Sequence, residues 1–395
     1  MFKNNRSLLI IALIAVINSL GYGIIIPILY SYSLKYGLTD FENGLLFAIF
    51  SICQFISTPI IGRLSDKFGR RPLLISSIFG TAVSFFMAAF APSAFFLFLA
   101  RALDGITAGN IPVASAVISD TTSDKERAKG FGIIGAAFGF GFVFGPAISA
   151  VTLRYGENVP FIIAGVVSLI TVFITYFFLP ETNKHMGGHV NLKNVFDFKK
   201  LVTAVADKAT GMTLLLSLIY NIAFGLFIFT FQPFAVKILE LSANTISVIY
   251  TIYGIVGLVA QGLIIPRVVR KYGEKNGLLF SFILGTLSFI GMYVSRDVTS
   301  FIVISVAFGI GNSFFLPVVQ SLLSKEVDAK SQGTILGLNS SYISLGTIIG
   351  PILGGFIATF GIPLPFILGA ILSCICFVLV YTKIKSSYHH EESLA

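Results

Sequence analysis

Runs of about 20 mainly apolar residues recur along this sequence from end to end, and they restrict the chain to a membrane fold, because a helix of that length crosses the hydrocarbon core of a bilayer. Arg101 and Asp104 are the only charged residues inside the runs, which cover residues 8–30, 43–62, 72–91, 93–118, 130–153, 159–179, 211–235, 243–265, 276–294, 300–323, 333–358 and 363–382. With 55% hydrophobic and 11% charged residues, the chain lacks the polar surface of a soluble globule. We therefore predict twelve transmembrane helices.

Basic residues are distributed unevenly among the segments between these runs. If the N-terminus is cytosolic, 22 of the 27 Lys and Arg residues lie in cytoplasmic segments, and only Lys35, Arg154, Lys237 and Arg296 lie on the opposite side. Cytoplasmic loops of membrane proteins carry this excess of positive charge. We therefore expect both termini in the cytosol, and we attribute the net charge of +9 to topology rather than to a nucleic-acid partner.

The sequence repeats itself at an offset of 205 residues. Four residues of the fifth run recur with the same spacing in the eleventh: Gly132, Gly141, Gly145 and Pro146 correspond to Gly337, Gly346, Gly350 and Pro351. The repeat predicts a first six-helix half at 1–180, a cytoplasmic linker at 181–210 and a second six-helix half at 211–395. Parallel repeats of this kind are related by an axis along the membrane normal and enclose a solute site near the midplane.

Four motifs resemble those of the major facilitator superfamily: the loop from Gly62 to Arg71, Arg101-x-x-Asp104-Gly105, Gly132-x8-Gly141-x3-Gly145-Pro146, and Leu179-Pro180-Glu181-Thr182. Together they look most like the tetracycline-efflux branch of the drug:proton antiporters. The resemblance covers nearly the whole chain. It implies an all-α membrane protein with twelve transmembrane helices in two pseudo-symmetric six-helix bundles, and it implies location in a bacterial cytoplasmic membrane.

The loop after the second run is expected to act as a conformational latch. The resemblance implies that Asp66 contacts the eleventh span and that Asp120 pairs with basic loop residues in one state of the transport cycle. The latch residues are Gly62, Asp66, Gly69, Arg70, Arg71 and Asp120. The alternative is a solvated basic turn, although topology alone requires neither Asp66 nor the two glycines.

Gly141 and Gly145 lie four residues apart, on one face of the fifth span. Small residues with this spacing let two helix backbones approach closely, and Pro146 can kink the helix. The resemblance implies that the partner is the opposite half of the protein, where the contact would close one side of the cavity. Generic helix packing is the alternative explanation.

Arg101 and Asp104 lie on the same side of one helix, because they are three residues apart. A charge at the bilayer centre costs about 2.5–3.5 kcal/mol on insertion scales, so two such charges indicate a function. They form either a structural ion pair or a proton-coupling site. The tetracycline exporters carry acidic residues and a histidine at positions that correspond to Asn18, Ser84 and Gly257, so Asp104 is the main carboxylate left to carry protons.

Polar residues in otherwise apolar spans are candidates to line a substrate cavity. They are Asn18, Tyr22, Gln54, Asn110, Asn221, Gln232, Gln261, Asn312, Asn339 and Tyr342. Uncharged amides among many phenylalanines suit an amphiphilic solute that is held by apolar contact and a few hydrogen bonds. Hydrogen bonds between helices are the alternative role for these residues.

No catalytic, metal-binding, cofactor-binding or ATP-binding pattern accompanies these features. The four histidines, His185, His189, His389 and His390, fall in the linker and the C-terminal tail. We therefore predict a monomeric secondary transporter, whose partners are a small-molecule solute, protons and the lipid bilayer, and which exports a lipophilic or amphiphilic compound. Two alternatives stay open: uptake or facilitated passage of a polar nutrient such as a sugar or a siderophore-related solute, and a non-transporting membrane receptor.

Overall fold

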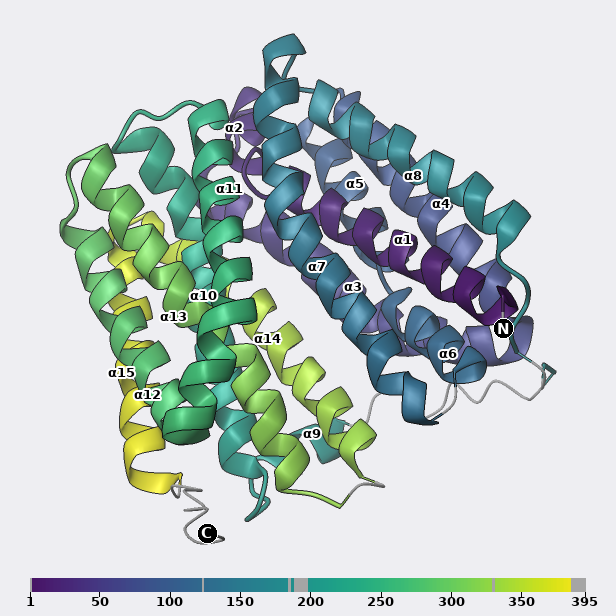
Figure 1. Ribbon diagram of the computed structural model, residues 1–395. Helices are drawn as coiled ribbons and strands as arrows, with labels where there is room; N and C mark the ends of the chain where they lie inside the picture. Colours follow the sequence, from purple (N-terminus) through teal and green to yellow (C-terminus); the bar gives the residue numbers. More distant parts are fainter. Residues whose placement is uncertain (1, 123, 184–185, 188–197, 329–330, 385–395) are drawn as a thin grey trace, which may run out of the picture. The chain divides into compact units, whose positions relative to one another are not determined.

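The computed structural model describes residues 2–122, 124–183, 186–187, 198–328 and 331–384, and this part of the chain is helical with short turns and without β-strands (Figure 1). The chain forms two compact units. The first unit comprises Met1–Asp197 and Ala235–Thr251, and the second comprises Phe198–Phe234 and Ile252–Ala395. The sequence repeat places Ala235–Thr251 in the second half, so the compact units and the predicted halves differ for that segment.

Ten segments of the described chain have the length and hydropathy of a membrane span. One of them, Ala243–Val294, has 52 residues and divides into two spans at Gly273, where the backbone leaves the helical conformation. A further helix at Asp124–Thr152 completes the predicted twelve spans.

The first unit begins with α1, which packs along α7 and also contacts α8 (Figure 1). Its helices are α1 (Phe2–Ile25), α2 (Leu29–Ser33), α3 (Asp40–Phe68), α4 (Arg70–Ala89), α5 (Ala94–Thr107), α6 (Ile111–Thr121), α7 (Asp124–Thr152) and α8 (Val159–Phe178). Side chains from α1, α4 and α6 form one buried aliphatic cluster, which includes Ile14, Ile78 and Val117. Apolar residues at helical spacing thus fix the packing of these helices.

The second unit is built around α12, which packs against α13 and α15. Its helices are α9 (Phe198–Ala204), most of α10 (Gly211–Lys237), the part of α11 (Ala243–Val259) from Ile252 onward, the π-helical turn η3 (Ala260–Ile264), α12 (Ile265–Val294), α13 (Val298–Lys325), α14 (Gln332–Ala358) and α15 (Leu364–Lys383). Phe227, Phe229, Phe231 and Phe234 of α10 are fully buried, and Phe227 packs against Phe308 of α13 with ring centres 4.2 Å apart.

Two predicted spans are interrupted in the structure. The first span was expected to continue through residue 30, but α1 ends at Ile25 and the chain turns through Pro27 before α2. The fourth span was expected as one helix over 93–118, but it divides into α5 and α6 around residues 108–110. A proline stands at each break or just after it, Pro27 and Pro112, and proline lacks the N–H that would continue the helical hydrogen bonds.

The loops before α4 and within α12 confirm the internal repeat at the level of the backbone. Gly69 has φ 99° and ψ 156°, and Gly273, which aligns with it at an offset of 204 residues, one less than in the spans, has φ 80° and ψ 166°. Residues with a Cβ are almost absent from this region of backbone conformation. At each of these two positions one helix ends and the next begins, and the backbone conformation there requires a glycine.

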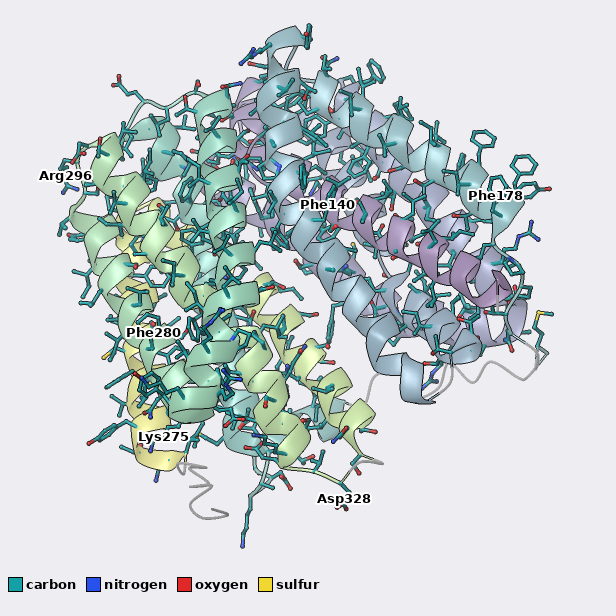
Figure 2. The ribbon with its side chains drawn as sticks, in the orientation of Figure 1. Phe140, Phe178, Lys275, Phe280, Arg296 and Asp328 are labelled. Carbon is teal, nitrogen blue, oxygen red and sulfur yellow. The ribbon has the colours of Figure 1, made fainter. Side chains whose placement is uncertain are left out.

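Large apolar side chains cover much of the outer surface of both units. Phe178 of α8 and Phe280 of α12, labelled in Figure 2, are 48% and 44% exposed. Exposed apolar surface on this scale is unfavourable in water and is expected where helices face lipid. The surface thus agrees with the twelve membrane spans.

Candidate functional site

Among the described residues of the first unit, the most deeply buried charges lie on α5. One Nη of Arg101 donates to a carboxylate oxygen of Asp104 at 2.7 Å, and the two residues are 4% and 7% exposed. The guanidinium lies 4.5 Å from the centre of the Phe50 ring on α3, which is a cation–π contact. That ring lies 5.8 Å from the ring of Tyr22 on α1. The structure therefore forms the pair and brings α1, α3 and α5 together around it.

The charges of Arg101 and Asp104 cancel, and this lowers the free-energy cost of burying the pair. If Asp104 were protonated while the surroundings stayed the same, the guanidinium of Arg101 would keep its charge in a region of low dielectric without a counter-ion. The Nε of Arg101 is buried and has no hydrogen-bond partner in the described part of the chain. Gain of a proton at Asp104 would thus favour a rearrangement that gives Arg101 new partners.

The break in the fourth span is held by a pair of amides. Asn18 of α1 donates to Asn110 at 2.6 Å, and Asn110 donates back to Asn18 at 3.3 Å. Asn110 is fully buried and lies at the start of α6. Both residues were predicted to line a cavity, and that prediction stays untested. Their contact matches the alternative role, a hydrogen bond between helices.

The loop between α3 and α4 contains the charge network expected of a latch. Arg70 contacts Asp66 at 2.6 Å and Asp120, at the end of α6, at 3.3 Å. Asp66 is exposed, with 66% of its side chain accessible. The predicted pairing of Asp120 with a basic loop residue is therefore present, while the contact of Asp66 with the eleventh span stays a prediction.

The sequence did not reveal the role of Glu181 in this loop. Its carboxylate accepts hydrogen bonds from the backbone N–H groups of Arg70 at 2.9 Å and Arg71 at 3.1 Å, the first residues of α4. These N–H groups have no partner within the helix, and the positive end of the helix dipole favours an anion. A residue 111 positions later in the chain therefore caps α4 and holds the loop between α3 and α4.

The second unit carries a counterpart of this network with the charges exchanged. Glu274 follows Gly273 as Arg70 follows Gly69, and Lys325 corresponds to Asp120 at the repeat offset. Lys325 forms an ion pair with Glu274, which is only 7% exposed and also accepts from the hydroxyl of Ser321 at 3.2 Å. In each unit an ion pair thus joins the residue after the loop glycine to the C-terminal end of another helix, which is α6 in the first unit and α13 in the second.

The glycines of α7 pack against α1. A Cβ at Gly145 would lie 2.7 Å from backbone atoms of Gly23, and one at Gly141 would lie 2.1 Å from the hydroxyl of Ser19. The expectation that their partner is the opposite half is therefore wrong in this structure, because α1 of the same unit occupies the glycine face. In the second unit, a Cβ at Gly350 of α14 would lie 2.7 Å from the Cα of Gly225 on α10. Gly132 lies on α7, outside the residues whose surroundings are described.

An ion pair joins two segments of the first unit that the sequence separates widely. Lys237, at the end of α10, donates to both carboxylate oxygens of Asp40, at 2.8 and 2.9 Å. Asp40 also accepts from the hydroxyl of the buried Tyr30. Asn244 of α11 donates to the carbonyl of Ala150 on α7. These contacts hold Ala235–Thr251 in the first unit.

The remaining cavity candidates have different surroundings. Asn221 donates to the Ser217 carbonyl of its own helix at 2.7 Å, and Gln232 is fully buried. Gln261 is exposed on the π-helical turn, and Gln54 is half-buried on α3. The prediction that they line a cavity stays untested.

Asn339 and Tyr342 of α14 are both buried in the second unit. The Oδ1 of Asn339 has no hydrogen-bond partner among the described residues. Tyr342 was expected to face a cavity, but it packs in the core of the second unit and donates to the carbonyl of Leu201 on α9. Tyr342 therefore fastens the linker helix to the unit.

Asn312 of α13 is the centre of a polar chain. It accepts from the hydroxyl of Tyr220 on α10 at 2.9 Å and donates to the hydroxyl of Tyr253 on α11 at 3.0 Å. Sequence reasoning selected Asn312 but missed the two tyrosines, because an aromatic residue in an apolar span resembles core packing.

In the part of the chain that the structure describes, no group of three or more His, Cys, Asp or Glu side chains could hold a metal ion. His185, His189, His389 and His390 lie outside the described residues. The arrangement offers a buried titratable pair and uncharged polar groups in apolar surroundings.

A family model described as Major Facilitator Superfamily matches residues 11–208 and 213–394. The chain is 30% identical over 397 residues to the class B tetracycline resistance protein of Escherichia coli, with 96% of each chain covered. It is 30% identical over 358 residues to multidrug resistance protein 2 of Bacillus subtilis (strain 168), with 88% of each covered. Among solved structures, a bacterial homologue of the human lysosomal transporter Spinster covers 96% of both chains with a TM-score of 0.77 and 15% identity, which shows a shared fold.

Proposed function

This chain belongs to the major facilitator superfamily, and from that premise we propose that it exports a lipophilic or amphiphilic small molecule in exchange for protons, by alternating access. The proteins named as tetracycline and multidrug resistance proteins are similar to it over most of their length. Uncharged amides and phenylalanines in the spans suit an amphiphilic solute better than a strongly polar one.

The observation that carries proton coupling is the buried pair of Arg101 and Asp104. An ionisable residue inside a membrane span is a functional-site hypothesis by default, because selection must outweigh the cost of its burial. Protonation of Asp104 removes the negative charge that compensates Arg101. Binding of one proton to Asp104 therefore destabilises the conformational state in which α1, α3 and α5 meet around the pair.

The exported solute is a drug-like compound and is not restricted to tetracycline. Asn18 and Ser84 stand where the tetracycline exporters have acidic residues, and in this structure both are occupied by hydrogen bonds. Asn18 pairs with Asn110, and the hydroxyl of Ser84 donates to the carbonyl of Thr81 at 2.7 Å. Gly257 stands in place of the histidine, and a Cβ there would lie 3.4 Å from Ser313. These neutral positions support a single proton-carrying residue, Asp104.

The protein is proposed to act as a monomer in the bacterial cytoplasmic membrane, with both termini in the cytosol. The excess of Lys and Arg in the segments that would face the cytosol supports this orientation. Asp66, Arg70 and Asp120 would then form their network on the cytosolic side, where it can stabilise one of the two access states.

Inverted membrane vesicles test direction and coupling together. The vesicles should accumulate tetracycline, norfloxacin or ethidium when respiration generates a proton gradient, and accumulation should collapse on addition of an uncoupler. Vesicles from cells that express Asp104→Asn provide the control for expression and leakage. Accumulation that persists with the uncoupler would contradict proton coupling, and accumulation in right-side-out vesicles instead would indicate import.

A further inference from the structure

The polar chain formed by Tyr220, Asn312 and Tyr253 lies near the middle of three membrane spans. The predicted spans 211–235, 243–265 and 300–323 have their midpoints within three residues of Tyr220, Tyr253 and Asn312, respectively. All three residues belong to the second unit. Polar groups at this depth are costly unless they pair with each other or serve a solute path, and the superfamily fold places its solute site at the same depth.

The direction of the hydrogen bonds follows from burial. Tyr220 is 2% exposed and stacks on Phe315 with ring centres 4.0 Å apart, so its hydroxyl hydrogen must find an acceptor inside the protein. Asn312 Oδ1 is that acceptor, which turns its amide N–H towards Tyr253.

Tyr253 is the open end of the chain. Its oxygen accepts from Asn312 at 3.0 Å, and in the described part of the chain its own hydroxyl hydrogen has no acceptor. Tyr253 is only partly buried, whereas Tyr220 and Phe227 are fully buried. A chain of donors that runs from the core to Tyr253 polarises the terminal hydroxyl and makes it a stronger donor.

The ring of Tyr253 is held in place by the surrounding residues. It is nearly parallel to the ring of Phe227, with centres 5.8 Å and planes 26° apart, and a Cβ at Gly309 would lie 3.0 Å from its edge. The exposed aliphatic face of α11 is formed by Ile252, Ile255 and Val259, at spacings of three and four residues. Tyr253 lies off that face and is partly exposed beside it.

We propose that Tyr253, oriented by Asn312 and Tyr220, is a solute-binding residue that selects planar aromatic compounds with a hydrogen-bond acceptor such as a carbonyl oxygen. The proposal rests on the transport function above and names the chemistry that one part of the solute site recognises. The aromatic surroundings supply apolar contact, and the hydroxyl of Tyr253 supplies one directional hydrogen bond.

The experiment compares Tyr253→Phe with the wild-type protein and with Tyr381→Phe, a matched control on the exposed face of α15. Export and binding are measured in proteoliposomes for tetracycline and norfloxacin, which carry carbonyl acceptors, and for ethidium, which carries amino donors only. Loss of one hydrogen bond predicts Kd and KM values about 3- to 10-fold higher for the two acceptor compounds. The values for ethidium should change less than twofold, and Tyr381→Phe should change neither.

A second measurement does not depend on the folding of the variant. Fluorenone and fluorene differ by one carbonyl, and in the wild-type protein fluorenone should compete with ethidium export at a concentration about 3- to 10-fold lower. Equal inhibition by the two compounds, or an equal effect of Tyr253→Phe on all solutes, would overturn the assignment while leaving export intact. A wild-type protein that exports none of the three compounds would instead refute the proposed function, and the assignment with it.

Discussion

The contact between α1 and α7 predicts a large effect from a single added methyl group. A Cβ at Gly145 would lie 2.7 Å from backbone atoms of Gly23 and 2.9 Å from the backbone nitrogen of Ile24. Backbone atoms cannot rotate away as a side chain can, so α1 must shift. Overpacking of this kind costs about 1–3 kcal/mol, which in Gly145→Ala exceeds the gain of up to about 1 kcal/mol in helix propensity.

Gly337 on α14 provides the matched control, because a Cβ there meets nothing within 4 Å. In Gly337→Ala only the helix-propensity gain remains, so the variant should be as stable as the wild type or more stable. Thermal unfolding in detergent, followed by size-exclusion chromatography of heated samples, measures the difference. Gly145→Ala should unfold roughly 1–4 °C below the wild type. If both variants unfold at the wild-type temperature, the close approach of α1 and α7 is not as described.

Three further predictions concern the polar contacts at the ends of the helices. Glu181→Gln should lower the unfolding temperature, because loss of a helix-capping anion costs about 0.5–2 kcal/mol. An unchanged temperature would show that the Glu181 carboxylate does not stabilise the start of α4. Asp40→Lys and Lys237→Asp should each alter the export rate, and the double exchange should restore it; failure of that rescue would show that the ion pair does not matter for transport. Hydrogen bonds from the backbone and the hydroxyl of Thr210 hold the pKa of Asp207 below its ordinary value of 3.8. The stabilisation by Asp207 is therefore complete above that value and is lost as the pH falls through the lower folded pKa, so Asp207→Asn should reduce thermal stability at pH 7 and not in strong acid.

Hydropathy and charge were sufficient to predict the spans and the buried pair. Lipid requires long uncharged helices, so the spans can be read directly from the sequence, and Arg101 and Asp104 stand out because charge is rare there. The breaks near Pro27 and Pro112 carried a signal, the prolines themselves, but proline also occurs within unbroken spans, as Pro351 does in α14. Proline alone therefore does not locate a break.

Residues whose roles depend on distant partners could not be found from the sequence. Glu181 reaches the start of α4 from 111 positions away, and no local pattern records that contact. The glycine spacing on α7 correctly predicts a close helix contact, yet it does not identify the helix that makes the contact. Tyr253 was missed because an aromatic residue in an apolar span resembles core packing, and the sequence does not show its hydrogen bond with Asn312 of another helix.

The central claim is that Asp104 is the residue that carries the coupled proton. Proton movement driven by the solute tests this claim most directly. Proteoliposomes with a trapped pH-sensitive dye receive a gradient of an exported compound, and proton flux is recorded for the wild type and for Asp104→Asn. The substitution keeps the size of the side chain and its hydrogen-bonding capacity but removes its titration. We expect the variant to fold, to bind the compound and to exchange it, while solute-driven proton flux disappears. Proton flux in Asp104→Asn equal to that of the wild type would contradict the assignment of Asp104 as the proton carrier.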